Sequence, residues 1–142
     1  MKVLIAVDDT PESMHAVDAA YRFFGPDADF HLISVGDRPP VFTGGYGAGA
    51  MPTAADLTRQ LDAAMEAARH AVQEASSHLP GSASLEVESG HAGRVICESA
   101  SEHEIDVIAI GSHERHFWER LIDPSVGRYL IDHAPCPVLV VR

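Results

Sequence analysis

The sequence contains few cationic residues, few cysteines and no long apolar run, and each shortage excludes a class of protein. Its 10 lysines and arginines stand against 21 aspartates and glutamates, so the net charge is −11. A field of that sign repels nucleic acid and anionic lipid, so neither is an expected partner. No apolar run reaches the length of a membrane span, and two aspartates interrupt the opening MKVLIAVDD before a signal-peptide core can form.

The two cysteines, Cys97 and Cys136, are too few for a disulfide framework. They suit a reduced compartment, so we expect a cytoplasmic protein. Common catalytic motifs are missing as well, because the chain has no nucleophile elbow, no Walker loop and no carboxylate pair placed by a recognisable motif. Asp8 and Asp9 are adjacent and diverge in direction after a strand, which disfavours a shared magnesium ion. We therefore predict no catalytic residue.

What the chain does contain is a regular alternation of strands and helices. Its 142 residues, 46% apolar and 22% charged, suit one globular domain over residues 1–142. Short apolar runs predict buried strands, and apolar residues at helical spacing predict helices between them. The predicted strands are 2–7, 29–35, 84–89, 106–111 and 137–141, and the predicted helices are 10–24, 56–79, 93–103 and 123–133. This α/β pattern predicts a single doubly wound domain, a parallel sheet with helices on both faces.

Two of the predicted strands lead into segments that could hold a ligand. The first strand runs into Asp8 and Thr10, and the fourth runs into Gly111 and Ser112. In doubly wound sheets, ligands bind beyond the carboxyl ends of the strands, where the strand order reverses. If the first and fourth strands are neighbours, the crevice between their ends is the expected site.

Residues 36–55 are rich in glycine and proline and lie between the second strand and the longest helix. The glycines superficially suggest a dinucleotide fingerprint, but they neither follow a strand directly nor open a helix at once. We interpret the segment as a flexible surface loop. The functional alternative is a lid over the crevice, with Tyr46 or Phe42 available to cover a base.

Three stretches resemble the universal stress protein family: VLIAVDDTPES near the start, GRVICESASEHEIDVIAIGSHER in the second half, and SVGRYLIDHAPCPVLVVR at the end. The resemblance runs from end to end and is loosest over 36–84. It implies a five-stranded sheet in the order 3-2-1-4-5, usually a dimer, and a role in stress survival. That order would put the first and fourth strands side by side.

Nucleotide-binding members of the family share a signature of glycine, two residues, glycine, nine residues, glycine, and then serine or threonine. Here Gly111 matches the first glycine, Glu114 and Pro124 replace the other two, and Ser125 keeps the hydroxyl. The resemblance therefore implies a nucleotide site that is preserved at its adenine end and altered at its phosphate end. The residues that it assigns to the site are Asp8, Val35, Ile110, Gly111, Ser112, Ser125 and Val126.

The substitutions in the signature oppose a phosphate for physical reasons. Glycine lets backbone N–H groups approach a phosphate closely, whereas Glu114 adds bulk and, if it faces inward, negative charge. Asp123 and Pro124 form a favoured helix opening, in which the carboxylate of the chain itself occupies the N–H groups that a phosphate would use. A divalent ion bridging Glu114 and phosphate would restore the site.

These observations predict a stress-response binding and interaction module with a degraded nucleotide site. It would bind AMP or ATP, with magnesium, weakly if at all. The alternative is a true ATP-binding family member that acts as a nucleotide-dependent switch, with slow ATP hydrolysis at most. For Asp8, the alternative to a base contact is that its carboxylate satisfies backbone N–H groups in the turn after the first strand.

Two further expectations concern the histidines and the last strand. His113 and His116, beside Glu114 and Glu119, do not have the spacing of a zinc site, so we predict no metal and interpret the nine histidines as solvated surface residues. The strand at 137–141 would be an uncharged apolar sheet edge, which predicts a homodimer through this strand. A further protein partner is also expected from the family's role.

Overall fold

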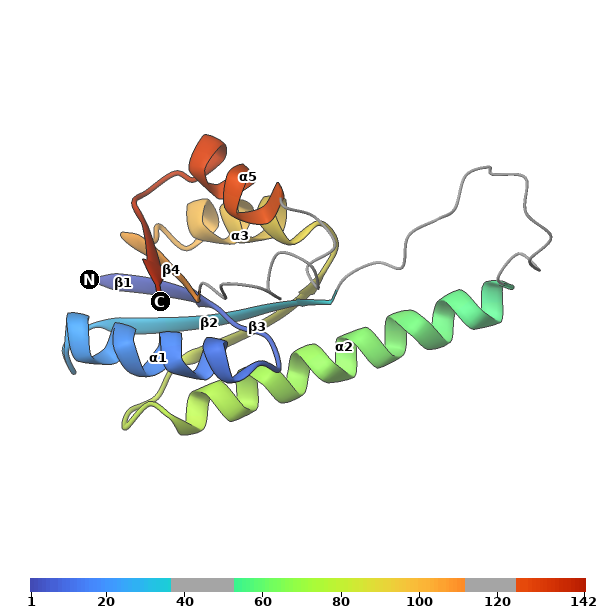
Figure 1. The fold of residues 1–142 in the computed structure, drawn as a ribbon, viewed down its shortest axis with the longest axis horizontal. Helices are drawn as coiled ribbons and strands as arrows, with labels where there is room; N and C mark the ends of the chain where they lie inside the picture. Colours follow the sequence, from blue (N-terminus) through green and yellow to red (C-terminus); the bar gives the residue numbers. More distant parts are fainter. Residues whose placement is uncertain (37–52, 112–124) are drawn as a thin grey trace.

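Five parallel strands form one sheet in the computed structural model of the chain, which describes residues 1–36, 53–111 and 125–142 (Figure 1). The strands alternate with helices along the chain. The strands are β1 (Lys2–Ala6), β2 (Asp29–Gly36), β3 (Ser84–Ser89), β4 (Val107–Gly111) and β5 (Val138–Val141), and the helices are α1 (Pro11–Phe24), α2 (Ala54–Ser77), α3 (Ala92–Glu102) and α5 (Ser125–His133).

The strand order is β3-β2-β1-β4-β5, which confirms the expected fold class. Strand β1 pairs in parallel with β2 on one side and with β4 on the other, with Ala6 opposite both Ile33 and Ile110. The carboxyl ends of β1 and β4 therefore lie side by side, as the crevice hypothesis required. The order reverses at this point, because the chain adds β2 and β3 on one side of β1 and β4 and β5 on the other.

Helices cover both faces of the sheet (Figure 1). Helices α1 and α2 lie on one face and α3 and α5 on the other, so each face has its own core. Strand β1 supplies both cores by alternation, since Val3 and Ile5 pack toward α1 and α2 whereas Leu4 packs toward α3 and α5. All three side chains are fully buried, which explains the nearly continuous apolar run at this position.

The expected ends of α1 are confirmed. Thr10 is the N-cap and accepts a hydrogen bond from the Ser13 N–H, and Pro11 occupies the first helical position. Gly25 follows the helix with φ of 78°, in the left-handed region where a side chain would be strained. Its N–H donates to the Tyr21 carbonyl and closes the last turn.

Helix α2 begins earlier and ends earlier than the sequence pattern predicted. Asp56, the expected first residue of the helix, instead occupies position N3 of a capping box whose N-cap is Thr53. The hydroxyl and the N–H of Thr53 both donate to the Asp56 carboxylate. These hydrogen bonds hold the pKa of Asp56 below its ordinary value. The glycine- and proline-rich segment is shortened accordingly, since Gly36 belongs to β2 and residues 54–55 belong to α2. The remainder of that segment, with Phe42 and Tyr46, lies outside the described residues.

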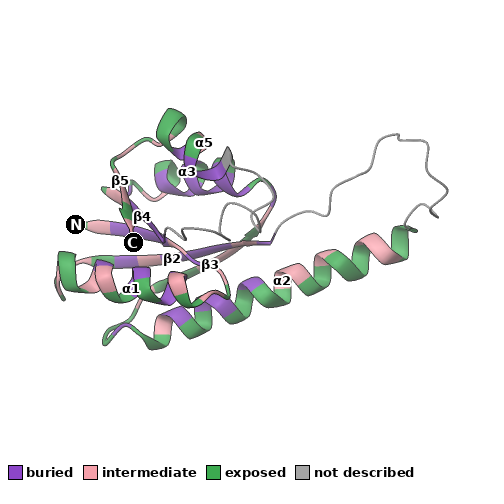
Figure 2. Ribbon diagram, in the orientation of Figure 1, coloured by how far each residue is buried: buried purple, intermediate pink, exposed green. Residues whose placement is uncertain are grey.

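Helix α2 is amphipathic but only its second half is buried. Its buried residues are Ala68, Ala71, Val72 and Ala75, and the first half extends beyond the sheet (Figure 2). Its length alone would span a bilayer, but no helix of the described residues is apolar enough along its length to cross a membrane.

Close approach of α3 to α5 depends on Gly93. A Cβ atom at this position would lie 2.9 Å from the Cβ of Tyr129 and 3.0 Å from its Cγ. Real carbon atoms do not pack so closely, so the two helices can touch here only because position 93 has no side chain. The same two helices form the upper wall of the molecule above β1 and β4 in Figure 1.

We predict that Gly93→Ala lowers the free energy of unfolding by about 1–2 kcal/mol, because overpacking costs about 1–3 kcal/mol while alanine in a helix regains up to about 1 kcal/mol. Urea denaturation followed by circular dichroism would measure the change. Gly81→Ala is the matched control, because a Cβ atom at Gly81 meets nothing within 4 Å. Equal stability of the two variants would show that α3 and α5 separate without cost.

Candidate functional site

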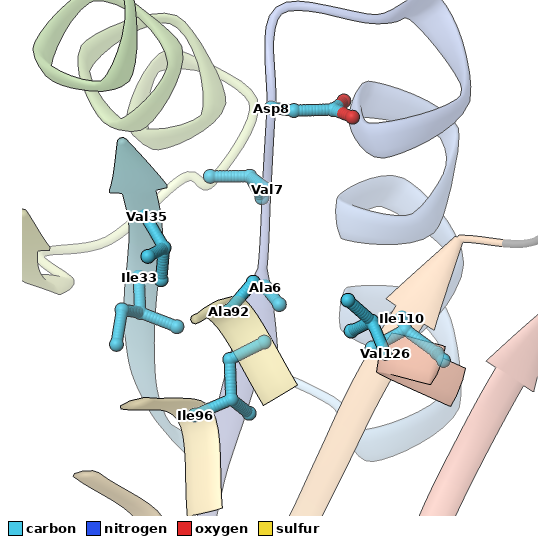
Figure 3. Close-up of a pocket in the computed structure, with 9 residues that line it drawn as sticks. All are labelled: Ala6, Val7, Asp8, Ile33, Val35, Ala92, Ile96, Ile110 and Val126. Atoms are coloured by element: carbon cyan, nitrogen blue, oxygen red, sulfur yellow. The ribbon is translucent and has the colours of Figure 1, made fainter. Parts of the chain in front are cut away.

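A pocket opens at the carboxyl ends of β1, β2 and β4, beneath the first turns of α3 and α5 (Figure 3). It holds about 450 Å³ of empty space, part of which is open to solvent. Only about 40 Å³ of it is cavity volume, so the pocket is shallow and an occupant would extend into the open side. The residues that line it are Ala6, Val7, Asp8, Ile33, Val35, Ala92, Ile96, Ile110 and Val126.

The lining is apolar because the pocket continues the core between the sheet and α3. Ile33 and Val35 alternate on one face of β2, and Ala92 and Ile96 lie one helical turn apart on α3. Ala6 on the sheet and Ala92 on the helix have small side chains, so they leave unfilled a space that larger side chains would occupy. Such a slot suits a flat, largely apolar ring better than a charged group.

Asp8 lies at the rim of this pocket, and its carboxylate points toward α1 (Figure 3). One oxygen, Oδ1, accepts hydrogen bonds from the Thr10 N–H at 3.1 Å, the Thr10 hydroxyl at 2.5 Å and the Ser13 hydroxyl at 2.5 Å. The Ser13 hydroxyl in turn accepts from the Asp8 N–H at 3.0 Å. Asp8 therefore ties the end of β1 to the first turn of α1.

This network supports the structural interpretation of Asp8, in which aspartate satisfies polar groups of the turn. Ser13 is 2% exposed, so its hydroxyl proton depends on the Asp8 carboxylate for an acceptor. Within the described part of the chain, hydrogen bonds reach only Oδ1 of Asp8. The second oxygen, Oδ2, is the atom of this side chain that a ligand could use.

Gly111 has a packing role that its place in the nucleotide signature did not reveal. A Cβ atom here would lie 3.0 Å from the carbonyl oxygen of Glu12 and 3.3 Å from its carbonyl carbon. Among the described glycines only Gly25 and Gly90 have positive φ, so Gly111 is needed for close approach rather than for an unusual backbone conformation. The first turn of α1 sits directly against the end of β4.

The structure brings together most of the predicted site residues that it describes. Val35, Ile110 and Val126 line the pocket, and Asp8 stands at its rim. Gly111 is buried at the end of β4, and Ser125 is the first residue of α5. The predicted residues Ser112, His113, Glu114, His116, Glu119, Asp123 and Pro124 lie outside the described residues.

Sequence reasoning missed the floor and the α3 wall of the pocket. Ile33 was assigned only to a buried strand, and Ala92 and Ile96 only to a helix or its edge. One signal was available: Ile33 is two residues from Val35 in a strand and so shares its face. No comparable signal pointed to α3, because its contact with β2 joins residues about sixty positions apart in the chain.

The described side chains around the site form no metal centre and include no activated nucleophile. Among residues 1–36, 53–111 and 125–142, no group of three or more histidine, cysteine or acidic side chains is arranged to hold a metal ion. Cys97 is buried and Cys136 half-buried, and both are free thiols. Burial raises the pKa of both, which keeps them protonated and unreactive at neutral pH.

A parallel sheet whose strand order reverses beside a pocket defines an α/β protein with the doubly wound architecture. The model of the universal stress protein family matches residues 1–142, so the chain belongs to this family. The universal stress protein Slr1101 of Synechocystis sp. is 36% identical over 52 residues, which are 37% of this chain and 48% of that protein. The alignment thus spans about half the length of that relative.

Solved structures of the family share the fold over nearly the whole chain. Universal stress protein UspA from Lactobacillus plantarum is 26% identical, with a TM-score of 0.67 over 100% of this chain and 97% of that one. A universal stress protein in complex with cAMP is 21% identical, with a TM-score of 0.66 over 100% and 97%. A family protein from Arabidopsis thaliana with AMP bound is 16% identical, with a TM-score of 0.64 over 99% and 90%.

Asp8→Ala should lower the free energy of unfolding by about 1–3 kcal/mol, because the buried Ser13 hydroxyl and the Thr10 N–H lose their acceptor. Asp9→Ala is the matched control, because Asp9 is an exposed neighbour of the same charge and has no hydrogen bond within the described residues. It should change stability by no more than about 0.5 kcal/mol. Urea unfolding of both variants would contradict the turn role if their stabilities were the same.

Proposed function

We propose that this chain is a stress-response binding module whose pocket takes an adenine nucleoside or nucleoside monophosphate and whose phosphate end is closed to a triphosphate. The observation that carries the proposal is the apolar pocket at the ends of β1 and β4, lined by Val35, Ile110 and Val126. These are residues that the family resemblance assigned to the nucleotide site. Two related structures are named with a nucleotide, cAMP in one and AMP in the other, and each of these nucleotides has a single phosphate.

The degraded phosphate end is inferred from the sequence. Glu114 and Pro124 stand where nucleotide-binding members carry glycine, and Asp123 precedes Pro124 as a helix-opening carboxylate. At about 5 Å and an effective dielectric constant near 20, one pair of like charges repels by roughly 3 kcal/mol. A second carboxylate at the start of the helix adds to the penalty, and every phosphate group of ATP beyond the first increases it.

The competing function is an ATP-dependent switch, in which magnesium offsets the carboxylates. Its support is the retained frame of the site, Gly111 at the end of β4 and Ser125 at the start of α5. A hard divalent cation would bind phosphate oxygens and a carboxylate such as that of Glu114 together. The two functions differ in a measurable preference, since the switch requires ATP with magnesium to bind more tightly than AMP.

The wild-type protein should bind AMP weakly and ATP no more tightly, with or without magnesium. The variant Glu114→Gly, Asp123→Leu and Pro124→Gly should shift the preference toward ATP, by about 1–3 kcal/mol for each recovered charge-assisted contact. Isothermal titration calorimetry on both proteins would measure the affinities. Tight ATP binding by the wild type would contradict the closed phosphate end and favour the switch.

A variant that fills the pocket tests whether AMP binds in this pocket or at another site. Ala92→Phe places a ring in the slot between α3 and β2, so it should abolish AMP binding. Ala67→Phe adds the same side chain at an exposed position of α2 and should leave binding unchanged. AMP binding that persists in Ala92→Phe would place the nucleotide elsewhere.

We further propose that the module is a cytoplasmic homodimer, paired through β5. Within the described residues this strand bonds to β4 on one side and to no strand on the other, and Val140 is 48% exposed on it. Its four residues, Val138–Val141, carry no charge and no proline, the features that protect an edge strand from pairing. At the opposite edge, β3 carries Glu86 and Glu88, so it is protected by charge. Free thiols and an acidic surface suit the cytoplasm.

Val140→Lys should convert the dimer to a monomer at micromolar concentration, because a charge on the pairing edge opposes strand addition. Leu85→Lys is a closely matched control on the other edge, since Leu85 is 47% exposed and Val140 is 48% exposed. Sedimentation velocity of the wild type and both variants would test the assignment. A monomeric wild type, or a dimer that resists Val140→Lys, would refute pairing through β5.

A further inference from the structure

Two histidines meet between the sheet and α3, away from the pocket. The ring centroids of His31 on β2 and His103 after α3 lie 5.6 Å apart, with an interplanar angle of 50°. Both side chains are half-buried. The other described histidines, at positions 15, 70, 78, 91 and 133, are exposed, as expected from the sequence. The solvated interpretation therefore holds only in part for His31 and His103, because the packing of α3 on the sheet partly covers both residues while the His103 side chain remains 41% exposed.

The histidine pair and the pocket share the same two elements. His31, Ile33 and Val35 alternate along one face of β2, and the last two line the pocket. Helix α3 lies over this face, with Ala92 and Ile96 at the pocket and His103 as its C-cap residue at the other end. A displacement of α3 at the histidine pair therefore moves the wall of the pocket.

Acidic and polar groups hold His103 in place against β3. The His103 Nδ1 lies 3.9 Å from Glu86 Oε2 and 3.0 Å from the Ser99 carbonyl oxygen. Glu86 Oε2 also accepts a hydrogen bond of 2.6 Å from the Ser99 hydroxyl. The Glu86 carboxylate therefore contacts both Ser99 and His103 at the end of α3.

Strand β1 contributes a positive charge to the same cluster. Lys2 Nζ donates a hydrogen bond of 2.9 Å to the His103 carbonyl and lies 4.0 Å from Glu104 Oε2. The Lys2 N–H donates to Asp106, which precedes β4. The charged groups that act on His31 are thus His103, Lys2, Asp29 and Glu86, from every element that packs around it on this face.

The balance of these groups disfavours a charged His31. Burial lowers the pKa of His31 below its ordinary value, and the positive charges of His103 and Lys2 lower it further, whereas Asp29 and Glu86 act in the opposite direction. The folded protein consequently takes up this proton less readily than the unfolded chain. Stability from a neutral His31 is complete above the unfolded-state pKa of this side chain and is lost as the pH falls through its folded-state pKa.

We propose that His31 and His103 form an acid-sensitive latch that holds α3 against β2 at neutral pH and releases it when both rings are protonated. Two imidazolium rings at this distance repel each other in a partly desolvated space. The released end of α3 belongs to the helix that walls the pocket, so acid also weakens ligand binding. This last consequence rests on the proposed function, whereas the latch itself does not.

The latch is tested without ligand by amide hydrogen exchange in α3 at pH of about 7.5 and about 5.5, after correction for intrinsic exchange rates. Wild type should lose protection at residues 96–103 in acid, and its melting temperature should fall. His31→Gln and His103→Gln should each suppress both changes, since either removes the repelling pair. His15→Gln, which replaces an exposed histidine, should behave as the wild type does.

Adenosine is the probe for the coupled effect, because unlike AMP it carries no phosphate that titrates in this range. Its affinity for the wild type should fall in acid, and His31→Gln should lose this dependence. Acid loss of α3 protection that is unchanged in both histidine variants would overturn the latch. Failure of adenosine to bind at either pH would refute the proposed function alone, since the exchange measurement stands without it.

Discussion

The parallel pairing of β1 with β4 is the constraint on which the rest of the structure depends. Because β2 and β3 lie on one side of β1 and β4 and β5 on the other, the chain builds the sheet in two opposite directions. Right-handed crossovers in opposite directions place their helices on opposite faces, so α1 and α2 separate from α3 and α5. The carboxyl ends of β1 and β4 lie side by side at this point, and the pocket opens beside them.

Close packing around the β1–β4 pair gives a structural reason for two residues that a functional interpretation alone would assign to ligand binding. Gly111 lies where the family signature begins, yet the backbone of Glu12 at the start of α1 already requires a glycine there. Asp8 follows β1 at the rim of the pocket, yet its Oδ1 is committed to Thr10 and Ser13. A position can thus match a nucleotide-binding family for structural reasons, and family membership does not by itself establish that a nucleotide binds.

Helix α3 connects the two chemically distinct regions of the molecule. Its first turns form an apolar wall over β2, and its last residues place Ser99 and His103 among charged groups of β1 and β3. Gly93 lets the same helix pack tightly on α5. We expect a helix held at both ends in this way to transmit a change at one end to the other, because packed interiors move as units rather than deform gradually.

The sequence by itself determined the features that depend on residues close together in the chain. Alternating periodicity predicted every strand and helix of the described chain, Thr10 and Gly25 marked the ends of α1, and family resemblance predicted the strand order. The predicted start of α2 at Asp56 was wrong, because Asp56 lies at N3 of a capping box whose N-cap is Thr53. These signals lie within a few residues of one another, where backbone geometry limits the alternatives.

Only the tertiary structure decided which distant residues meet. It placed Ala92 and Ile96 over Ile33 to form the pocket, His103 over His31, and the backbone of Glu12 against Gly111. Such contacts depend on the depth at which each helix packs on the sheet, and the combined packing of many side chains sets that depth. Periodicity within one element carries no information about that depth, so the pocket wall and the half-buried histidine pair became visible only when α3 was seen packed on β2.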